Sequence, residues 1–266
     1  MHGWRRALLL IVGAALVIVA SLPDRTLVAA QGPPVCNPAN FNIAIDVGHT
    51  PEAPGTTSAR GVTEYAYNLQ LSNEIKRALL EGGYSRITLI TAPGIGRTQL
   101  LARVKRANAL NVDLLLSVHH DDVQDLYHAK WNYNGVTRAF SDKFSGYSLF
   151  VSRQNQYFDH SLTFAKLLGA ALMAQGMRYS AHHAEAIPGE GRQLIDSKTG
   201  VYLYDNLVVL KFTKAPAVLL EAGVIVNRVE ELVLASPEGR EHIGAAILEA
   251  VSQFCRETGS RSGTRG

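Results

Sequence analysis

Three apolar segments of the chain each lead into a residue of the kind that binds metals or exchanges protons. They are residues 42–47, which lead to His49, residues 113–118, which lead to His119, and residues 217–220, which lead to Glu221. Their aliphatic and β-branched residues predict buried strands. Open α/β sheets carry their functional residues at the carboxyl ends of the strands. The pattern therefore predicts a sheet with one polar site along that edge.

A further acidic residue, Glu64, stands where a helix is expected to begin. A loop rich in Pro, Gly, Thr and Ser separates it from His49. Thr63 can cap a helix over residues 64–81, which a pair of glycines ends. Two imidazoles and a carboxylate suit a catalytic zinc site that keeps one position open for water. A second carboxylate, Glu221, suits the general base of such a site.

Strands and helices alternate along the middle of the chain. Further strands are expected over residues 86–91, 147–152 and 207–210, and helices over 99–109, 162–175 and 237–254, the first and last of them capped by Thr98 and Ser236. This alternation predicts parallel strands joined by helices that cover both faces of the sheet. We therefore expect an α/β fold, a twisted and mostly parallel sheet flanked by helices on both faces.

Four short motifs and their order along the chain point to a known family. They are Asp46-Val47-Gly48-His49, Gly61-Val62-Thr63-Glu64, Ser117-Val118-His119 and Pro216-Ala217-Val218-Leu219-Leu220-Glu221, with Gly223 and Asn227 just after. Leu100, Arg103, Ala107 and Asn108 add a further matching pattern. Over residues 41–254 the chain resembles the zinc-dependent N-acetylmuramoyl-L-alanine amidases with an AmiC-type catalytic domain, the amidase_3 family.

The resemblance implies a peptidoglycan hydrolase with a phosphorylase/hydrolase-like fold. The bond to be cut joins N-acetylmuramic acid to the L-alanine of the stem peptide, so muropeptides are the expected substrates. Zn²⁺ is the expected cofactor, with His49, Glu64 and His119 as its ligands and Glu221 as the catalytic base. Four other residues are expected beside the ligands or at the substrate, namely Asp46, His120, Asp121 and Asn227.

Two other functions fit the same residues. One is a different zinc peptidase that cuts within the stem peptide. The other is a non-catalytic peptidoglycan-binding protein that has kept the fold. The presence of both histidines and both glutamates of the expected site argues against the binding protein.

Three residues depart from the family pattern. Thr50 follows His49 where the family has a glycine, which predicts a stiffer loop. His120 replaces a small residue, and Asp121 replaces an asparagine. His119 and His120 are therefore both candidates for the metal ligand, and the place of His119 within its motif favours His119.

Two more segments bear on the expected site. His182, His183 and Glu185 lie in a polar, glycine-containing stretch, which we interpret as a solvated loop rather than a second metal site. Some members of the family carry an inhibitory helix after the strand that ends here near Ser152. Residues 153–160 are too few for such a helix, so no activator protein is expected.

The N-terminus indicates a targeting segment. Arg5 and Arg6 precede an uncharged apolar run over residues 7–20, which is typical of a signal-peptide core and short for a membrane span. Val28-Ala29-Ala30 offers a cleavage site. We therefore expect a signal peptide over residues 1–30 and export to the periplasm or the medium. An uncleaved membrane anchor is the alternative.

The rest of the chain has the size of one domain. The expected parts are a short N-terminal segment (31–40), the catalytic domain (41–256) and a disordered tail (257–266). With 26 Lys and Arg against 23 Asp and Glu, the net charge of +3 predicts no nucleic-acid partner, and a monomer is expected. In an exported chain the two cysteines, Cys36 and Cys255, are expected to form a disulfide, the alternative being two free thiols.

Overall fold

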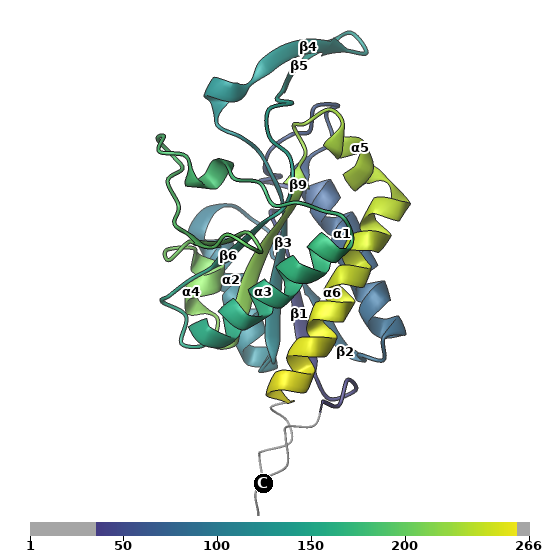
Figure 1. The fold of residues 1–266 in the computed structure, drawn as a ribbon, viewed down its shortest axis with the longest axis vertical. Coiled ribbons are helices and arrows are strands. Elements are labelled where there is room, and N and C mark those ends of the chain that lie inside the picture. The colour runs from purple at the N-terminus through teal and green to yellow at the C-terminus, as the bar shows by residue number, and fades with distance from the viewer. Residues whose placement is uncertain (1–35, 260–266) are drawn as a thin grey trace, which may run out of the picture. The chain divides into compact units, whose positions relative to one another are not determined.

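The fold is built around a seven-stranded sheet with the strand order β2-β1-β3-β9-β6-β8-β7 (Figure 1). The computed structural model describes residues 36–259, which all belong to one of the chain's two compact units, Pro34–Gly266. The strands of the sheet are β1 (Asn42–Val47), β2 (Arg86–Ile90), β3 (Leu114–Asp121), β6 (Ser148–Val151), β7 (Leu194–Asp196), β8 (Val201–Leu203) and β9 (Ala217–Val224).

Four neighbouring strands, β2, β1, β3 and β9, run parallel to one another. β1 pairs in parallel with β2 and β3, β3 with β9, and β6 with β8, whereas β6 with β9 and β7 with β8 are antiparallel. β1, β3 and β9 are buried over nearly their whole length, which is why their sequences are continuously apolar. Because His119 stands opposite Glu221 in the register of β3 and β9, two predicted site residues lie side by side.

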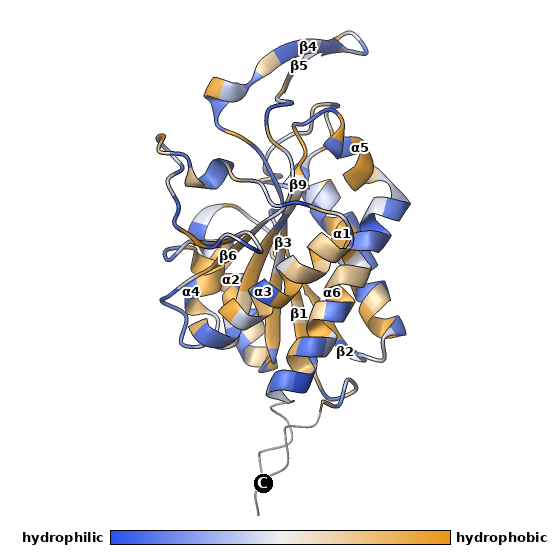
Figure 2. Ribbon diagram, in the orientation of Figure 1, coloured by the Kyte–Doolittle hydropathy of each residue, from blue (hydrophilic) through white to orange (hydrophobic). Residues whose placement is uncertain are grey.

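Helices cover both faces of the sheet, which confirms the predicted fold class. Successive residues of β1, such as Ile43 and Ala44, point to opposite faces of the sheet and belong to two different hydrophobic cores. The first core includes side chains of α1, α3 and α6, and the second includes side chains of α2 and α4. Figure 2 shows hydrophobic strands inside and hydrophilic residues on the outer sides of the helices. The helices are α1 (Glu64–Glu81), α2 (Gly96–Leu110), α3 (Phe158–Ala174), α4 (Val208–Phe212), α5 (Glu230–Ala235) and α6 (Pro237–Thr258).

Several predicted elements differ from the structure. Residues 207–210, predicted as a strand, lead into and form the start of helix α4. Periodicity cannot separate a short buried helix from a buried strand, which accounts for this error. Helix α2 begins at Gly96 rather than after Thr98, and its N-cap residue Ile95 provides no side-chain cap. Strands β7 and β8 were not predicted.

The segment between β3 and β6 contains a small hairpin of β4 (Ala129–Tyr133) and β5 (Val136–Phe140). It extends away from the main sheet at the top of Figure 1. Asn134 and Gly135 form its turn, with φ angles of 52° and 80°. Both angles lie in the left-handed region that a type I′ hairpin turn requires, and Asn-Gly is the preferred pair for it.

A disulfide between Cys36 and Cys255 joins the segment before β1 to helix α6. Helix α6 ends at Thr258, so residues 257 and 258 of the predicted tail are helical. The predicted signal peptide and the end of the predicted tail, residues 260–266, lie outside the described residues. Within residues 36–259, no helix combines the length and the apolar character needed to cross a membrane.

Candidate functional site

The structure brings His49, Glu64 and His119 together at the carboxyl edge of the sheet. His49 Nε2 lies 2.9 Å from Glu64 Oε2, and His119 Nδ1 lies 3.0 Å from Glu64 Oε1. The ligand atoms of all three residues lie within 4.8 Å of one another, so the group could hold a metal ion. The two imidazole rings meet edge to face, with centroids 5.0 Å apart. Each residue comes from the element that the sequence predicts for it.

Glu64 is buried between the two imidazoles as the first residue of α1. Its Oε1 accepts hydrogen bonds from the Asn68 side chain at 3.2 Å and from the His120 backbone N–H at 3.3 Å. Burial opposes ionisation of Glu64, but the hydrogen bonds with the imidazoles outweigh it and hold its pKa below the usual value. Glu64 therefore presents a charged carboxylate to both histidines.

Asp46 supports the site through Arg103 and not through the imidazole of His49. Asp46 Oδ1 accepts a hydrogen bond from Arg103 Nη1 at 2.9 Å, and each side chain is 2% exposed. Asp46 Oδ2 accepts a hydrogen bond from Ser117 Oγ at 2.8 Å. Arg103 also donates to the carbonyl oxygens of Val47 and His49. This buried ion pair thereby fixes the backbone that carries His49.

His120 lies on the opposite face of β3 from His119, because side chains alternate along a strand. Its Nδ1 lies 2.7 Å from Asn68 Oδ1, and its ring packs against Tyr67. The residue is 2% exposed, and burial lowers its pKa to about 3. His120 is therefore outside the metal-binding group and out of reach of a substrate. Its backbone N–H supports Glu64.

Glu221 lines a cavity of about 530 Å³ together with His49 and His119. Its Oε2 is shielded from solvent and has no hydrogen-bond partner among residues 36–259. Burial raises the pKa of Glu221 well above its usual value, and the charges of Asp121 and Glu64 raise it further. A carboxyl group in this state is suited to taking up and releasing a proton.

The side chain of Asp121 faces His182 and His183. It does not pair with the imidazoles of His119 and His120, which precede it in the sequence. Its Oδ2 lies 2.8 Å from His183 Nε2 and 3.3 Å from His182 Nε2. The interpretation of this stretch as a solvated loop is wrong for both histidines, since His182 is 1% exposed and His183 is 5% exposed. Glu185 stands apart and accepts a hydrogen bond from Tyr127. The adjacent histidines were visible in the sequence, but their partner lies 62 residues away from His183.

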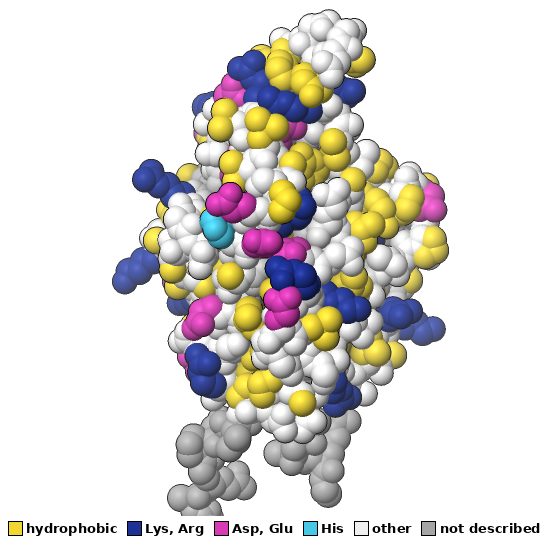
Figure 3. Space-filling view, turned by 90° about the vertical axis from the view of Figure 1, so that its right-hand side faces the viewer, with side chains coloured by type: hydrophobic (Ala, Val, Ile, Leu, Met, Phe, Trp, Pro, Cys, Tyr) yellow, Lys and Arg dark blue, Asp and Glu magenta, His cyan; other side chains and the backbone are white. Residues whose placement is uncertain are grey.

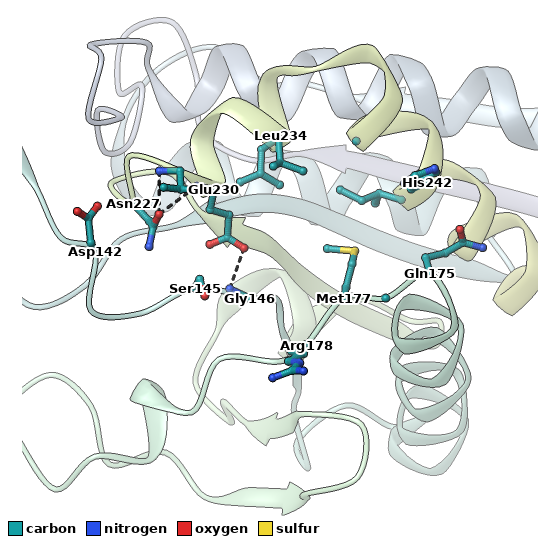
Figure 4. Close-up of a pocket in the computed structure, with 15 residues that line it drawn as sticks. Asp142, Ser145, Gly146, Gln175, Met177, Arg178, Asn227, Glu230, Leu234 and His242 are labelled. Atoms are coloured by element: carbon teal, nitrogen blue, oxygen red, sulfur yellow. Dashed lines mark hydrogen bonds between the residues drawn. The ribbon is translucent and has the colours of Figure 1, made fainter.

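Asn227 lines a different cavity from the one that holds Glu221. This second cavity has a volume of about 560 Å³ and is also lined by Glu230 and His242 (Figure 4). Asn227 Oδ1 accepts hydrogen bonds from the N–H groups of Val229 and Glu230, each at 3.0 Å. Its observed contacts shape the chain between β9 and α5, away from the metal-binding group.

The aromatic residues of the β4–β5 hairpin pack against arginines and do not line the cavity of Glu221. Trp131 and Tyr133 stack with ring centroids 5.2 Å apart. The guanidinium groups of Arg60 and Arg228 lie 5.3 and 5.2 Å from the Trp131 ring. Figure 3 shows hydrophobic and basic side chains next to one another at this end of the molecule.

Several solved structures share this fold. Ami1 from Mycobacterium smegmatis, an N-acetylmuramyl-L-alanine amidase, is 20% identical with a TM-score of 0.61, and the match covers 82% of this chain and 98% of that one. The N-acetylmuramoyl-L-alanine amidase from Clostridium difficile 630 is 19% identical with a TM-score of 0.59, covering 83% of this chain and 100% of that one. AmiC2 of Nostoc punctiforme is 18% identical with a TM-score of 0.59, covering 82% and 98%.

Comparison of the sequence with protein families identifies the family of the chain, whereas the solved structures show only its fold. No curated protein matches it. The sequence profile of the Amidase_3 family, described as N-acetylmuramoyl-L-alanine amidase, matches residues 43–253, which include all four residues of the predicted metal and base positions. The chain therefore belongs to the N-acetylmuramoyl-L-alanine amidase family of peptidoglycan hydrolases.

Proposed function

We propose that this amidase works with a zinc ion held by His49, Glu64 and His119, and with Glu221 as its general base. The observation that carries the proposal is the convergence of these side chains at one edge of the sheet, where both histidines and Glu221 line the same cavity. The bond cut is the amide between N-acetylmuramic acid and the L-alanine of the stem peptide.

The donor atoms suit zinc better than the harder divalent cations. Two imidazole nitrogens and one carboxylate are a common catalytic zinc set, whereas calcium and magnesium prefer oxygen ligands. The positive charge of the ion would also match the ionised carboxylate of Glu64. When bound, zinc lowers the pKa of a water ligand toward ~7 and polarises the carbonyl of the scissile amide.

Glu221 performs the proton transfers of the reaction. Its shielded carboxylate accepts a proton from the attacking water and then delivers it to the nitrogen of the leaving L-alanine. A raised pKa suits both steps, because it strengthens the base and keeps the acid form available for the leaving amine. An amide nitrogen is a poor leaving group, so this second transfer is necessary.

The segment between β6 and α3 is too short to hold an inhibitory helix. Only residues 152–157 separate β6 from α3, and no helix lies between them. One similar structure, the CwlD amidase from Clostridioides difficile, was solved in complex with the GerS lipoprotein. For this chain we propose that no activator is needed and that it acts on peptidoglycan outside the cytoplasm. Strong stimulation of the purified enzyme by an added protein would contradict this.

Glu221→Gln separates catalysis from metal binding. We expect the variant to keep its zinc and to lose activity on muropeptides by about 10²- to 10⁴-fold, the usual contribution of a general base. His119→Ala should lose both zinc and activity, whereas Glu185→Gln, outside the site, should lose neither. Full activity of Glu221→Gln, or retention of zinc by His119→Ala, would contradict the assignment.

A further inference from the structure

Asp121, His182 and His183 form a second group of metal-ligand types outside the proposed zinc site. The Nε2 atoms of both histidines face Asp121 Oδ2, at 3.3 Å for His182 and 2.8 Å for His183. The ligand atoms of the three residues lie within 4.8 Å of one another, and all three residues are buried. We propose that this group binds a second divalent transition-metal ion, of the zinc type.

The outer nitrogens of both imidazoles are already engaged. His182 Nδ1 lies 2.7 Å from Ser180 Oγ, and His183 Nδ1 lies 2.9 Å from Glu190 Oε2. Histidines that bind metals through one nitrogen commonly hold the other nitrogen in this way, often to a carboxylate. The arrangement directs both Nε2 atoms toward Asp121.

The Nε2 atom of His182 is a buried polar atom without a hydrogen-bond partner among residues 36–259. Its side chain is 1% exposed, and no hydrogen bond of acceptable geometry reaches its Nε2 among the described residues. A proton shared by Asp121 and His183 satisfies only one of the two histidines, whereas a metal ion at the centre would satisfy all three side chains.

The surroundings fit a bound ion. Phe144 packs against the ring of His182 at 5.3 Å between centroids, and Phe150 packs against that of His183 at 4.9 Å. Such an apolar shell strengthens the attraction between an ion and its ligands. Two imidazoles and one carboxylate again match zinc rather than calcium or magnesium.

Residues of the second site line the same cavity as residues of the proposed zinc site. Asp121 follows His119 by two residues on β3, and the register between β3 and β9 shifts between them. Asp121, His183 and Glu190 all line the cavity that holds Glu221. An ion bound here would therefore link the segment that carries His182 and His183 to strand β3. This link would hold one wall of the cavity in place.

Metal stoichiometry tests the proposal. The purified protein is stripped with a chelator, dialysed against Zn²⁺ or Co²⁺, and its metal content is measured. We expect two ions per chain in the wild type, one in His182→Ala, one in His49→Ala and none in the double variant. His160→Ala, which removes an exposed histidine, should keep both ions. Ser180→Ala should weaken the second site by about 10- to 100-fold without deleting a ligand.

The outcomes distinguish the two sites. One ion in the wild type that is lost in His49→Ala and kept in His182→Ala would overturn the second site and leave the first. One ion that is lost only in His182→Ala would support the second site and overturn the proposed zinc site. No bound ion in a wild-type protein whose circular dichroism shows it folded would overturn both.

Discussion

His49 has a backbone conformation that few residues other than glycine adopt, with a φ angle of 65°. Such a conformation is held only where the surroundings enforce it, and it is commonest at functional sites. Here Arg103 enforces it by donating to the carbonyl of His49 while it is paired with Asp46. The sequence pattern predicted His49 at the end of its strand, but the role of Asp46 depends on a contact between distant elements that no local pattern reveals.

Arg103→Met tests the buried ion pair at the residue scale. The change leaves Asp46 buried without its charged partner, so we expect the free energy of unfolding to fall by about 3–5 kcal/mol. The affinity for zinc should also fall, because His49 loses the support of its backbone. Denaturant unfolding and metal titration measure both effects. Arg106→Met, on an exposed position of the same helix, should change stability by less than about 0.5 kcal/mol.

Glu230 makes stability depend on pH. Its oxygens accept hydrogen bonds from the N–H groups of Gly146 and Val224, yet burial raises its pKa to about 7. The folded state therefore holds this proton more tightly than the unfolded state does. Deprotonation of Glu230 therefore lowers the free energy of unfolding. This decrease begins as the pH rises above the unfolded pKa of ~4.3 and reaches its full size above a pH of about 7.

We expect Glu230→Gln to become more stable relative to the wild type as the pH rises from 4 to 8, by up to about 3 kcal/mol. Urea unfolding at several pH values measures the difference. Glu241→Gln, at an exposed position of α6, should show no such trend. A difference between Glu230→Gln and the wild type that stays constant with pH would contradict the explanation.

At the scale of elements, the most accurate predictions of helices and strands came from strong local sequence signals. Thr63 caps α1, which spans residues 64–81 as predicted, because its cap and its apolar face are both local features. The short run 207–210 was assigned wrongly because burial hides the periodicity that separates a strand from a helix. The buried group around Asp121 was missed for a different reason, since its members meet only when β3 and the segment after α3 pack together.

Gly55→Ala tests how the loop between β1 and α1 shapes the site. Gly55 has a φ angle of 78°, and a Cβ atom there would overlap Glu64 Oε2 and lie 2.8 Å from the His49 ring. We expect zinc affinity to fall at least tenfold, as measured by competition with a chelating dye. Gly135→Ala is the matched control, since its φ is 80° but nothing lies within 4 Å of the added carbon. An equal loss of zinc affinity in both variants would contradict this explanation, because it would show that backbone strain alone causes the loss.

At the scale of the whole molecule, the Cys36–Cys255 disulfide closes nearly all of the described chain into one loop, with a sequence separation of 219. A long closed loop restricts the unfolded state strongly. The pairing could be predicted because no other cysteine competes for either partner. The parallel order of the central strands was predictable from the alternation of elements, but the antiparallel pairing of β6 with β9 was not.

Cys36→Ala/Cys255→Ala should lower the free energy of unfolding by about 2–5 kcal/mol and leave activity under native conditions intact. Neither cysteine lines the cavity that holds Glu221, so the effect should be confined to stability. Guanidinium unfolding of the oxidised wild type and the double variant measures it. An unchanged unfolding midpoint would show that the disulfide contributes nothing.

The most direct test of the proposed amidase reaction is mass spectrometry of the products from a defined muropeptide. We expect an intact stem peptide with a free L-alanine amine and a free carboxyl on the muramic acid. Removal of metal should abolish the reaction, and added Zn²⁺ should restore it in the wild type but not in His119→Ala. Cleavage within the stem peptide, or undiminished amide cleavage after the metal has been removed, would contradict a metal-dependent amidase.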